Sequence, residues 1–176
     1  ILIELIFRCR ISNLILLCFI IYSTLAGFMG CVLNFYNTSS FGLDVWYDIF
    51  IHGLVGYIFA FIGLIVISRF ENYKKLSPWT VLLFCIFLTL AIELVWELME
   101  WFADNCLGQY SQGYPPEGQS VPLVTDTNID LLCNFIGAIV FAIHFIIAKF
   151  TKLKLGFDFI EKELCGTYEE IISPIL

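Results

Sequence analysis

The stretch from Thr80 to Asp104 constrains the fold more than any other part of the chain, because it is long and apolar yet acidic at one end. Its first thirteen residues carry no charge, and about 20 apolar residues in a helix suffice to cross the hydrocarbon layer of a membrane. Glu93, Glu97, Glu100 and Asp104 follow, at spacings of four, three and four. At about 100° per residue these carboxylates share one narrow stripe of the helix. A carboxylate near the middle of a bilayer costs at least about 2.5–3.5 kcal/mol, so the stripe must face other helices, water or an ion.

The composition places the whole chain in the membrane class. Hydrophobic residues make up 60% of the 176 residues and charged residues 14%, far from the balance of a soluble domain. The net charge of −7 is a poor match for nucleic acid, so we expect no nucleic-acid partner. We therefore predict an all-α, polytopic transmembrane helical bundle embedded in the lipid bilayer. The sequence does not indicate whether this bundle also binds a membrane-protein partner or another copy of itself.

Four apolar segments are predicted to span the membrane. They cover about 13–33, 45–68, 79–102 and 127–148. Residues 1–155 then form the transmembrane bundle, and residues 156–176 form a cytoplasmic amphipathic tail, because short apolar runs alternate there with charges. The chain begins with Ile1, so we expect it to start inside a longer or processed protein, and the sequence does not indicate what precedes this residue. A secretory signal is the competing interpretation of the first apolar segment.

The basic residues predict the orientation. All nine Lys and Arg lie before the first span, between the second and third spans, or after the fourth. The positive-inside rule then places both termini and the middle loop in the cytoplasm, and the other two loops outside. We expect a multi-pass protein of the cytoplasmic (inner) membrane with cytoplasmic N- and C-termini.

Polar side chains on three different spans are expected at similar depth. Counted from the outer helix ends at 1.5 Å per residue, His52, Glu97 and Asn134 lie about 10–12 Å deep. Glu93 is the deepest acid of the third span, at about 16 Å. We therefore expect an acidic pocket that contains His52 and opens outward. Gly56 continues the polar stripe of the second span one turn deeper, so helix backbones can approach closely there.

The residues that meet in this pocket are candidate ligands for a cation. The candidate metal ligands are His52, Glu93, Glu97 and Asp130, and the supporting polar residues are Asp48, Glu100, Asp126 and Asn134. Several carboxylates with one imidazole suit a divalent ion such as Mg²⁺, Mn²⁺ or Zn²⁺. The sequence names no catalytic residue and contains no phosphate-binding loop, nucleophile elbow or dinucleotide fingerprint. The second histidine, His144, is predicted near the inner end of the fourth span, far from the pocket, as a core or interfacial residue.

Three sequence blocks carry a resemblance to a known family. They are Tyr47-Asp48-x-x-x-His52-x-x-x-Gly56, Trp96-Glu97-x-x-Glu100-Trp101, and Asp126-Thr127-x-x-Asp130 followed by Gly137-Ala138. In order and internal spacing they resemble the YjdF-type family of uncharacterised bacterial inner-membrane proteins, and the last block is more loosely similar to the VanZ-like membrane proteins. The resemblance covers roughly the second to fourth spans. It implies a multi-pass helical membrane protein whose biochemical activity is not established.

Three functions fit these observations. The first is binding or relay of a cation or proton by the acidic pocket, in which crowded carboxylates exchange ions with the outer solution. The second is a metal-dependent membrane hydrolase that activates water against a lipid-linked or extracytoplasmic substrate. The third is a structural or assembly subunit whose polar network only locks three helices together. A purely structural network rarely needs so many groups of one sign, because carboxylates repel one another.

Overall fold

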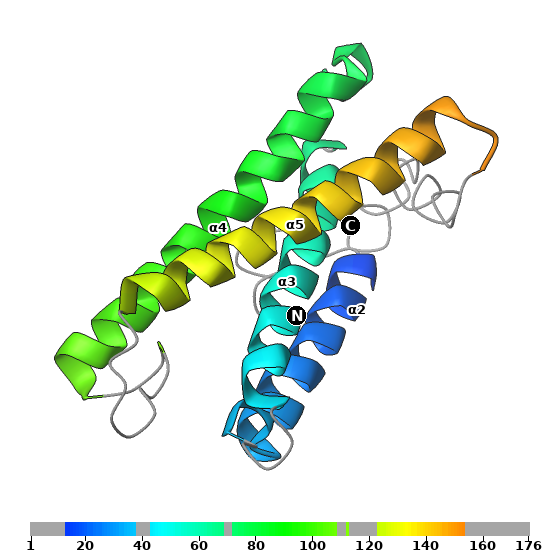
Figure 1. Ribbon diagram of the computed structural model, residues 1–176. Coiled ribbons are helices and arrows are strands. Elements are labelled where there is room, and N and C mark those ends of the chain that lie inside the picture. The colour runs from blue at the N-terminus through cyan, green and yellow to red at the C-terminus, as the bar shows by residue number, and fades with distance from the viewer. Residues whose placement is uncertain (1–12, 38–42, 69–71, 109–111, 113–122, 154–176) are drawn as a thin grey trace, which may run out of the picture.

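The computed structural model describes residues 13–37, 43–68, 72–108, 112 and 123–153, and the regular elements in these ranges are helical (Figure 1). In chain order they are α2 (Asn13–Tyr22), the π-helix η1 (Ser23–Val32), the 3₁₀ turn η2 (Phe35–Asn37), α3 (Leu43–Ser68), the 3₁₀ turn η4 (Tyr73–Lys75), α4 (Pro78–Leu107) and α5 (Leu123–Phe150).

Four segments of these described ranges are long and apolar enough to cross a membrane. They are Asn13–Val32, Trp46–Ser68, Pro78–Leu107 and Thr125–Phe150. The predicted all-α fold with about four spans is therefore confirmed. The predicted amphipathic tail, residues 156–176, lies outside the described residues, and the division at residue 155 stays a prediction.

Helix α4 begins and ends at residues suited to helix termini. The Oγ atom of Ser77 accepts a hydrogen bond of 3.1 Å from the backbone N–H of Thr80, and Pro78 occupies the first turn, where no backbone N–H is needed. At the other end Gly108 has φ 65°, a left-handed conformation that glycine adopts readily. The helix runs for 30 residues and so extends beyond the predicted span end at residue 102.

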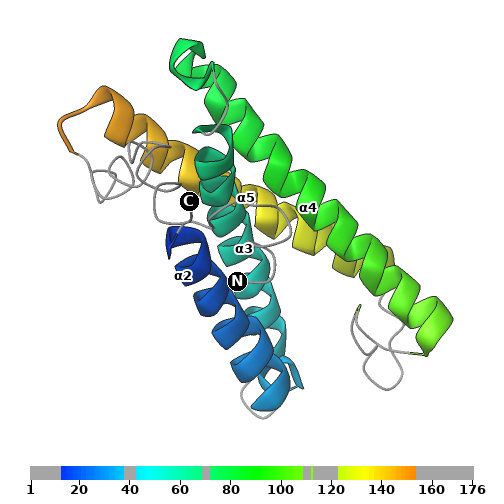
Figure 2. The ribbon, with the colours of Figure 1, turned by 180° about the vertical axis from the view of Figure 1, so that it is seen from behind.

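Helix α3 is the centre of the arrangement. It packs most extensively against α5 and then against α4, and α4 and α5 also contact each other. Helix α2 lies along the opposite side of α3 from α4, as the two opposed views show (Figures 1 and 2). The site described below is built on α3, α4 and α5.

The backbones of α3 and α5 touch at two glycines. A Cβ atom at Gly56 would collide with the backbone oxygen of Asn134, and a Cβ atom at Gly137 would collide with the backbone oxygen of Gly53. Small residues permit this approach between membrane helices. The close contact predicted at Gly56 is confirmed, and it brings the polar stripes of α3 and α5 together.

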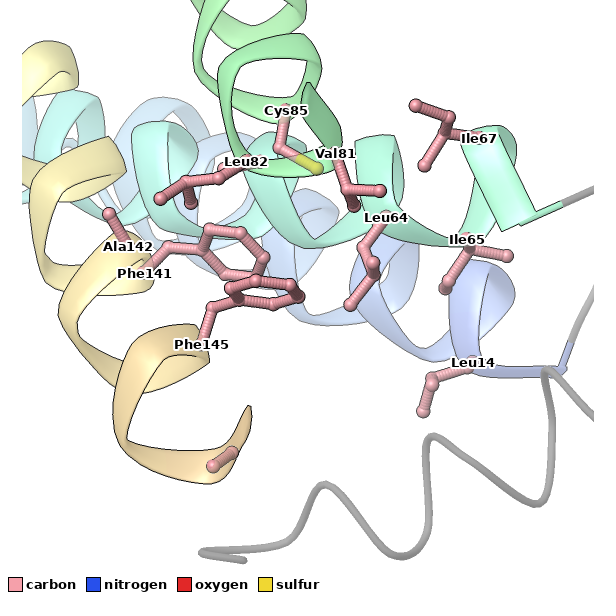
Figure 3. Close-up of a cluster of buried hydrophobic side chains, with 12 residues drawn as sticks. Leu14, Leu64, Ile65, Ile67, Val81, Leu82, Cys85, Phe141, Ala142 and Phe145 are labelled. Carbon is pink, nitrogen blue, oxygen red and sulfur yellow. The ribbon is translucent and has the colours of Figure 1, made fainter. Parts of the chain in front are cut away.

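An apolar core fills the half of the bundle that contains the ends of α3 and α5 and the start of α4. Figure 3 shows these side chains converging from α3, α4 and α5, with one contribution from α2. They include Leu14, Leu64, Ile65, Leu82, Phe141 and Phe145. The polar cluster lies in the other half, so α3, α4 and α5 change from polar to apolar contacts along their length.

The first span differs from the expected regular helix, because ten of its residues form a π-helix. The backbone N–H of Leu33 donates to the oxygen of Phe28, a spacing of five residues, at 2.9 Å. The hydroxyl of Tyr47 on α3 donates a 2.7 Å hydrogen bond to the backbone oxygen of Leu25. This bond ties the widened segment to α3.

Candidate functional site

His52 on α3 is the centre of a buried polar cluster. Its side chain is 7% exposed, and its two ring nitrogens face different acids. The Nδ1 atom is hydrogen-bonded to Oε1 of Glu93 on α4. The Nε2 atom lies 3.5 Å from Oδ1 of Asp48 and 3.9 Å from Oδ1 of Asp130 on α5. One imidazole therefore contacts acids from all three helices of the site.

Glu93 is held in place from two sides. Its second carboxylate oxygen accepts a 2.9 Å hydrogen bond from Nδ2 of Asn134, whose own oxygen accepts a 3.4 Å hydrogen bond from the hydroxyl of Thr89. Glu93, Asn134 and Thr89 are each at most 1% exposed. A chain of hydrogen bonds thus runs from Thr89 through Asn134 and Glu93 to His52.

Glu97 is buried without a hydrogen-bond partner. Its side chain is 3% exposed, and neither carboxylate oxygen has a hydrogen-bond partner among the described residues. Thr127 on α5 is near enough to interact electrostatically but does not form a hydrogen bond of normal geometry. A buried acceptor without a donor is costly, so a cation, a proton or a water molecule beside Glu97 would stabilise it.

Two overlapping groups of residues have the spacing of metal ligands. One consists of Asp48, His52 and Asp130, and the other of His52, Glu93 and Glu97; within each group the ligand atoms lie within 4.8 Å of one another. Imidazole nitrogen and carboxylate oxygen are ligands that proteins use for Zn²⁺ and related ions. The arrangement could therefore hold a cation.

The four predicted metal ligands, His52, Glu93, Glu97 and Asp130, come together in the structure, and Asp48 and Asn134 join them. Glu100 does not join either group; it accepts a 2.7 Å hydrogen bond from the indole N–H of Trp96, one turn earlier on α4. Asp126 is half-buried and interacts electrostatically with Asp48 and Asp104 rather than belonging to either group. These placements do not test which residues bind a metal, and the ligand set stays a prediction.

The direct partner of His52 on α4 is Glu93, the acid predicted to lie deepest. The helical rise places Glu93 about 4 Å deeper than His52, and the two side chains are nevertheless hydrogen-bonded. Depth counted along each helix therefore did not identify which acid of α4 contacts His52.

Three residues of the site were missed. Thr89 lies one turn before Glu93 on the same stripe of α4, a four-residue spacing that was present in the sequence and could have found it. Thr127 stands three positions before Asp130. Gln112 is 6% exposed; its backbone N–H donates to Asp104 and its side-chain amide donates to the Thr127 hydroxyl at 2.8 Å. Its position in a loop gave no signal.

His144 is satisfied by a neighbour far from the cluster. Its Nδ1 atom lies 2.6 Å from the hydroxyl of Tyr57, and the two rings stack with their planes 13° apart. His144 is half-buried at ten positions after Asn134 on α5, so it belongs to the apolar half of the bundle. The interpretation of His144 as a core residue is therefore confirmed.

The four apolar helices and the buried histidine–acid cluster together define a multi-pass membrane protein that could hold a cation between its helices. The chain belongs to the family described as Predicted membrane protein (DUF2238), whose model matches residues 1–150. Neither the curated proteins nor the solved structures contained a match. The finer resemblance to the YjdF-type proteins stays a prediction.

Proposed function

We propose that this protein binds a cation inside the membrane, in the cluster of His52, Glu93, Glu97 and Asp130 with Asp48 beside it. One observation carries the proposal: both carboxylate oxygens of Glu97 are buried next to His52 and Glu93, and no residue in the described ranges forms a hydrogen bond with them. Burying an unpaired carboxylate costs several kcal/mol, whereas a cation bound there would give the oxygens a partner.

The charges of the cluster support the same proposal. Four carboxylates gather around one imidazole, and even a protonated His52 would leave them with an excess of negative charge. The Lys residues within the described ranges are Lys74, Lys75, Lys149 and Lys152, which lie before α4 begins or around the end of α5, away from the cluster. Among the described residues no Lys neutralises the cluster, and a bound cation or protons would supply positive charge there.

The positive-inside rule supports a site that faces outward. The cluster lies towards the start of α3 and α5, whereas the four described Lys residues lie at the opposite end of the bundle. The proposed location is the cytoplasmic (inner) membrane, with both termini in the cytoplasm and the cation taken from the outer solution.

The test is cation-dependent stability of the purified, chelator-treated protein in detergent. We expect Zn²⁺, Mn²⁺ or Mg²⁺ to raise the melting temperature in a saturable way, because a ligand at 100 times its Kd stabilises by about 2.7 kcal/mol. Glu97→Gln and Asp130→Asn should reduce the shift, whereas Glu100→Gln, on the same helix but outside both ligand groups, should retain it. An equal shift in all three variants, or none in the wild type, would contradict the proposal.

A proton is the other cation that this cluster can carry. In that case proteoliposomes containing the protein should show proton uptake without any metal, and Glu97→Gln should abolish it.

A structural or assembly role predicts a different result again: Gln and Asn replacements of all the buried acids should leave both the fold and the cellular function intact.

A metal-dependent hydrolase is the second candidate, and Glu97 also favours it. A free carboxylate beside metal ligands is the usual arrangement of a general base for a metal-bound water. The probes are a phosphate monoester and a lipid diphosphate in detergent micelles, because the proposed substrate is lipid-linked or extracytoplasmic. We expect Glu97→Gln to keep the metal and lose the hydrolysis, and a metal-loaded protein that hydrolyses neither probe would count against this candidate.

A further inference from the structure

The two nitrogens of His52 are not equivalent as ligands. Nδ1 is in direct hydrogen-bond contact with Glu93, which leaves no space for an ion between them, and the other oxygen of Glu93 is occupied by Asn134. Nε2 faces Asp48 and Asp130 at 3.5 and 3.9 Å, beyond the 2.7–2.9 Å or so of a charge-assisted hydrogen bond. The space for an ion is therefore on the Nε2 side.

These separations fit ligands of a four-coordinate ion. Two donor atoms that each lie about 2.1 Å from an ion at the tetrahedral angle are about 3.4 Å apart, whereas octahedral coordination brings them to about 3.0 Å. The 3.5 Å between His52 Nε2 and Asp48 matches the tetrahedral value, and the 3.9 Å to Asp130 is slightly wider. Asp48 and His52 are four residues apart on one face of α3, a spacing that metal-binding helices use.

The ligand types favour a transition ion over Mg²⁺ or Ca²⁺. Both of the latter prefer all-oxygen sites, whereas imidazole nitrogen suits Zn²⁺ and its neighbours in the first transition row. Many catalytic zinc sites have three protein ligands and leave the fourth position open to water or another ligand. Asp48 is about one-third exposed, so this side of His52 is reached from solvent more easily than the buried Glu93 side.

The hydrogen-bond chain behind His52 has the form of an orienting shell. A histidine that binds a metal usually donates its other N–H to a carboxylate, which fixes the tautomer and the ring orientation. Here Nδ1 is hydrogen-bonded to Glu93, and an ionised Glu93 carboxylate requires Nδ1 to be the donor; Asn134 donates to Glu93, and Thr89 donates to Asn134. This leaves the lone pair of Nε2 directed towards Asp48 and Asp130.

We infer that the cation is a four-coordinate divalent transition ion of the zinc type, bound by Nε2 of His52, Asp48 and Asp130, with Glu93 orienting His52 rather than binding the ion. This inference rests on the proposed function and divides the roles of its residues. Glu97, which groups with His52 and Glu93 rather than with Asp48 and Asp130, is in this assignment a nearby acceptor and not a ligand of the ion.

The experiment titrates the chelator-treated full chain in detergent with Co²⁺ and follows visible absorption, because four-coordinate Co²⁺ absorbs far more strongly than six-coordinate Co²⁺. We expect strong bands in the wild type, and in Glu93→Gln the same bands with an affinity about 10–100-fold lower. Asp48→Asn and Asp130→Asn keep the side-chain shape but remove a charged ligand, so each should lower the affinity for Co²⁺ by more than about 100-fold. Glu100→Gln is the matched control and should bind as the wild type does.

X-ray absorption of the Zn²⁺-loaded wild type keeps the inference testable if a variant fails to fold. A four-coordinate shell of one imidazole with oxygen donors at about 2.0–2.2 Å supports it, and a six-coordinate shell of oxygens without an imidazole overturns it. Weak six-coordinate Co²⁺ bands, or full binding in Asp48→Asn with complete loss in Glu93→Gln, would also overturn it while the proposed cation binding stands. If no cation binds to the wild type, the proposed function fails as well.

Discussion

The imidazole of His52 on α3 is hydrogen-bonded to the carboxylate of Glu93 on α4, 41 positions further along the chain. Both side chains are buried, and Asn134 of α5 completes the contact through the second oxygen of Glu93. The same bonds that position the candidate ligand thus hold three membrane helices together. Stability and binding are therefore coupled at this point, and the variants below separate them.

Glu93→Ala should destabilise the protein strongly in the absence of any added ion. Removing one partner of a buried charged pair costs about 3–5 kcal/mol, because His52 and Asn134 are left without their acceptor. Denaturant titration of the protein in detergent measures this loss. Glu100→Ala is the control, since the hydrogen bond of Glu100 is to Trp96 on the same helix, and its loss should cost about 1 kcal/mol or less. Equal losses in the two variants would contradict the buried role of Glu93.

Glu97→Gln should have the opposite effect on the metal-free protein. The change replaces a buried, unpartnered carboxylate by a neutral group of the same shape, so we expect stability to rise by about 1–3 kcal/mol after chelator treatment. The difference should shrink or reverse when Zn²⁺ is added. Paired melting curves with and without the ion measure both effects, and a metal-free variant less stable than the wild type would be the contrary outcome.

Gly56→Ala and Gly137→Ala should each weaken the contact between α3 and α5. The new methyl group would meet a backbone oxygen, which cannot move aside as a flexible side chain can, so we expect a loss of about 1–3 kcal/mol. Gly27→Ala is the matched control, because no atom lies within 4 Å of its added Cβ. Unfolding of the three variants in detergent tests this, and a Gly56→Ala protein as stable as Gly27→Ala would refute the tight packing.

Tyr57→Phe should remove one hydrogen bond in the apolar half without affecting the cation. The Tyr57 hydroxyl and His144 are 2.6 Å apart, and such a bond contributes about 0.5–1.5 kcal/mol. A double-mutant cycle with His144→Leu should show a coupling energy of that size. Cation affinity should stay at the wild-type value, so a large change in affinity would mean that the pair communicates with the cluster.

The orientation can be tested by cysteine labelling in intact cells. Cys106 is an exposed free thiol near the end of α4, on the cluster side of the bundle. With the other cysteines replaced, we expect a membrane-impermeant maleimide to label Cys106 from outside. A cysteine introduced by Lys152→Cys should react only after permeabilisation. The reverse pattern would place the cluster on the cytoplasmic side.

Much of the fold could be predicted from single residues and their spacing. The uncharged run before Glu93 predicted a membrane span, because its length matches the thickness of the hydrocarbon layer. Gly56 predicted a close contact with another helix, because a small residue lets two backbones approach. The π-helix from Ser23 to Val32 could not be predicted in this way, because a span requires an apolar helix but does not distinguish the i→i−4 hydrogen bonds of an α-helix from the i→i−5 bonds of a π-helix.

The sequence predicted which residues gather in the candidate site, but not which acid contacts His52. Spacing of four residues brought the acids of α3, α4 and α5 to one level within a few ångströms, since every helix has the same rise. Which acid of α4 contacts His52 depends on how α3 and α4 pack, which is a tertiary property. Hence Glu93 rather than Glu97 became the partner, and Thr89, an uncharged residue in an apolar run, was overlooked.

The close backbone contact at Gly56 and Gly137 also restricts the passage of an ion between α3 and α5. To travel from His52 to the end of the bundle that carries Lys149, an ion would have to part α3 from α5 and then cross side chains such as Phe141 and Leu64, neither of which offers it a ligand. If the cluster does bind a metal ion as proposed, this packing of α3 and α5 would favour release of the ion on the side from which it arrived. The bound metal would then serve at one face of the membrane.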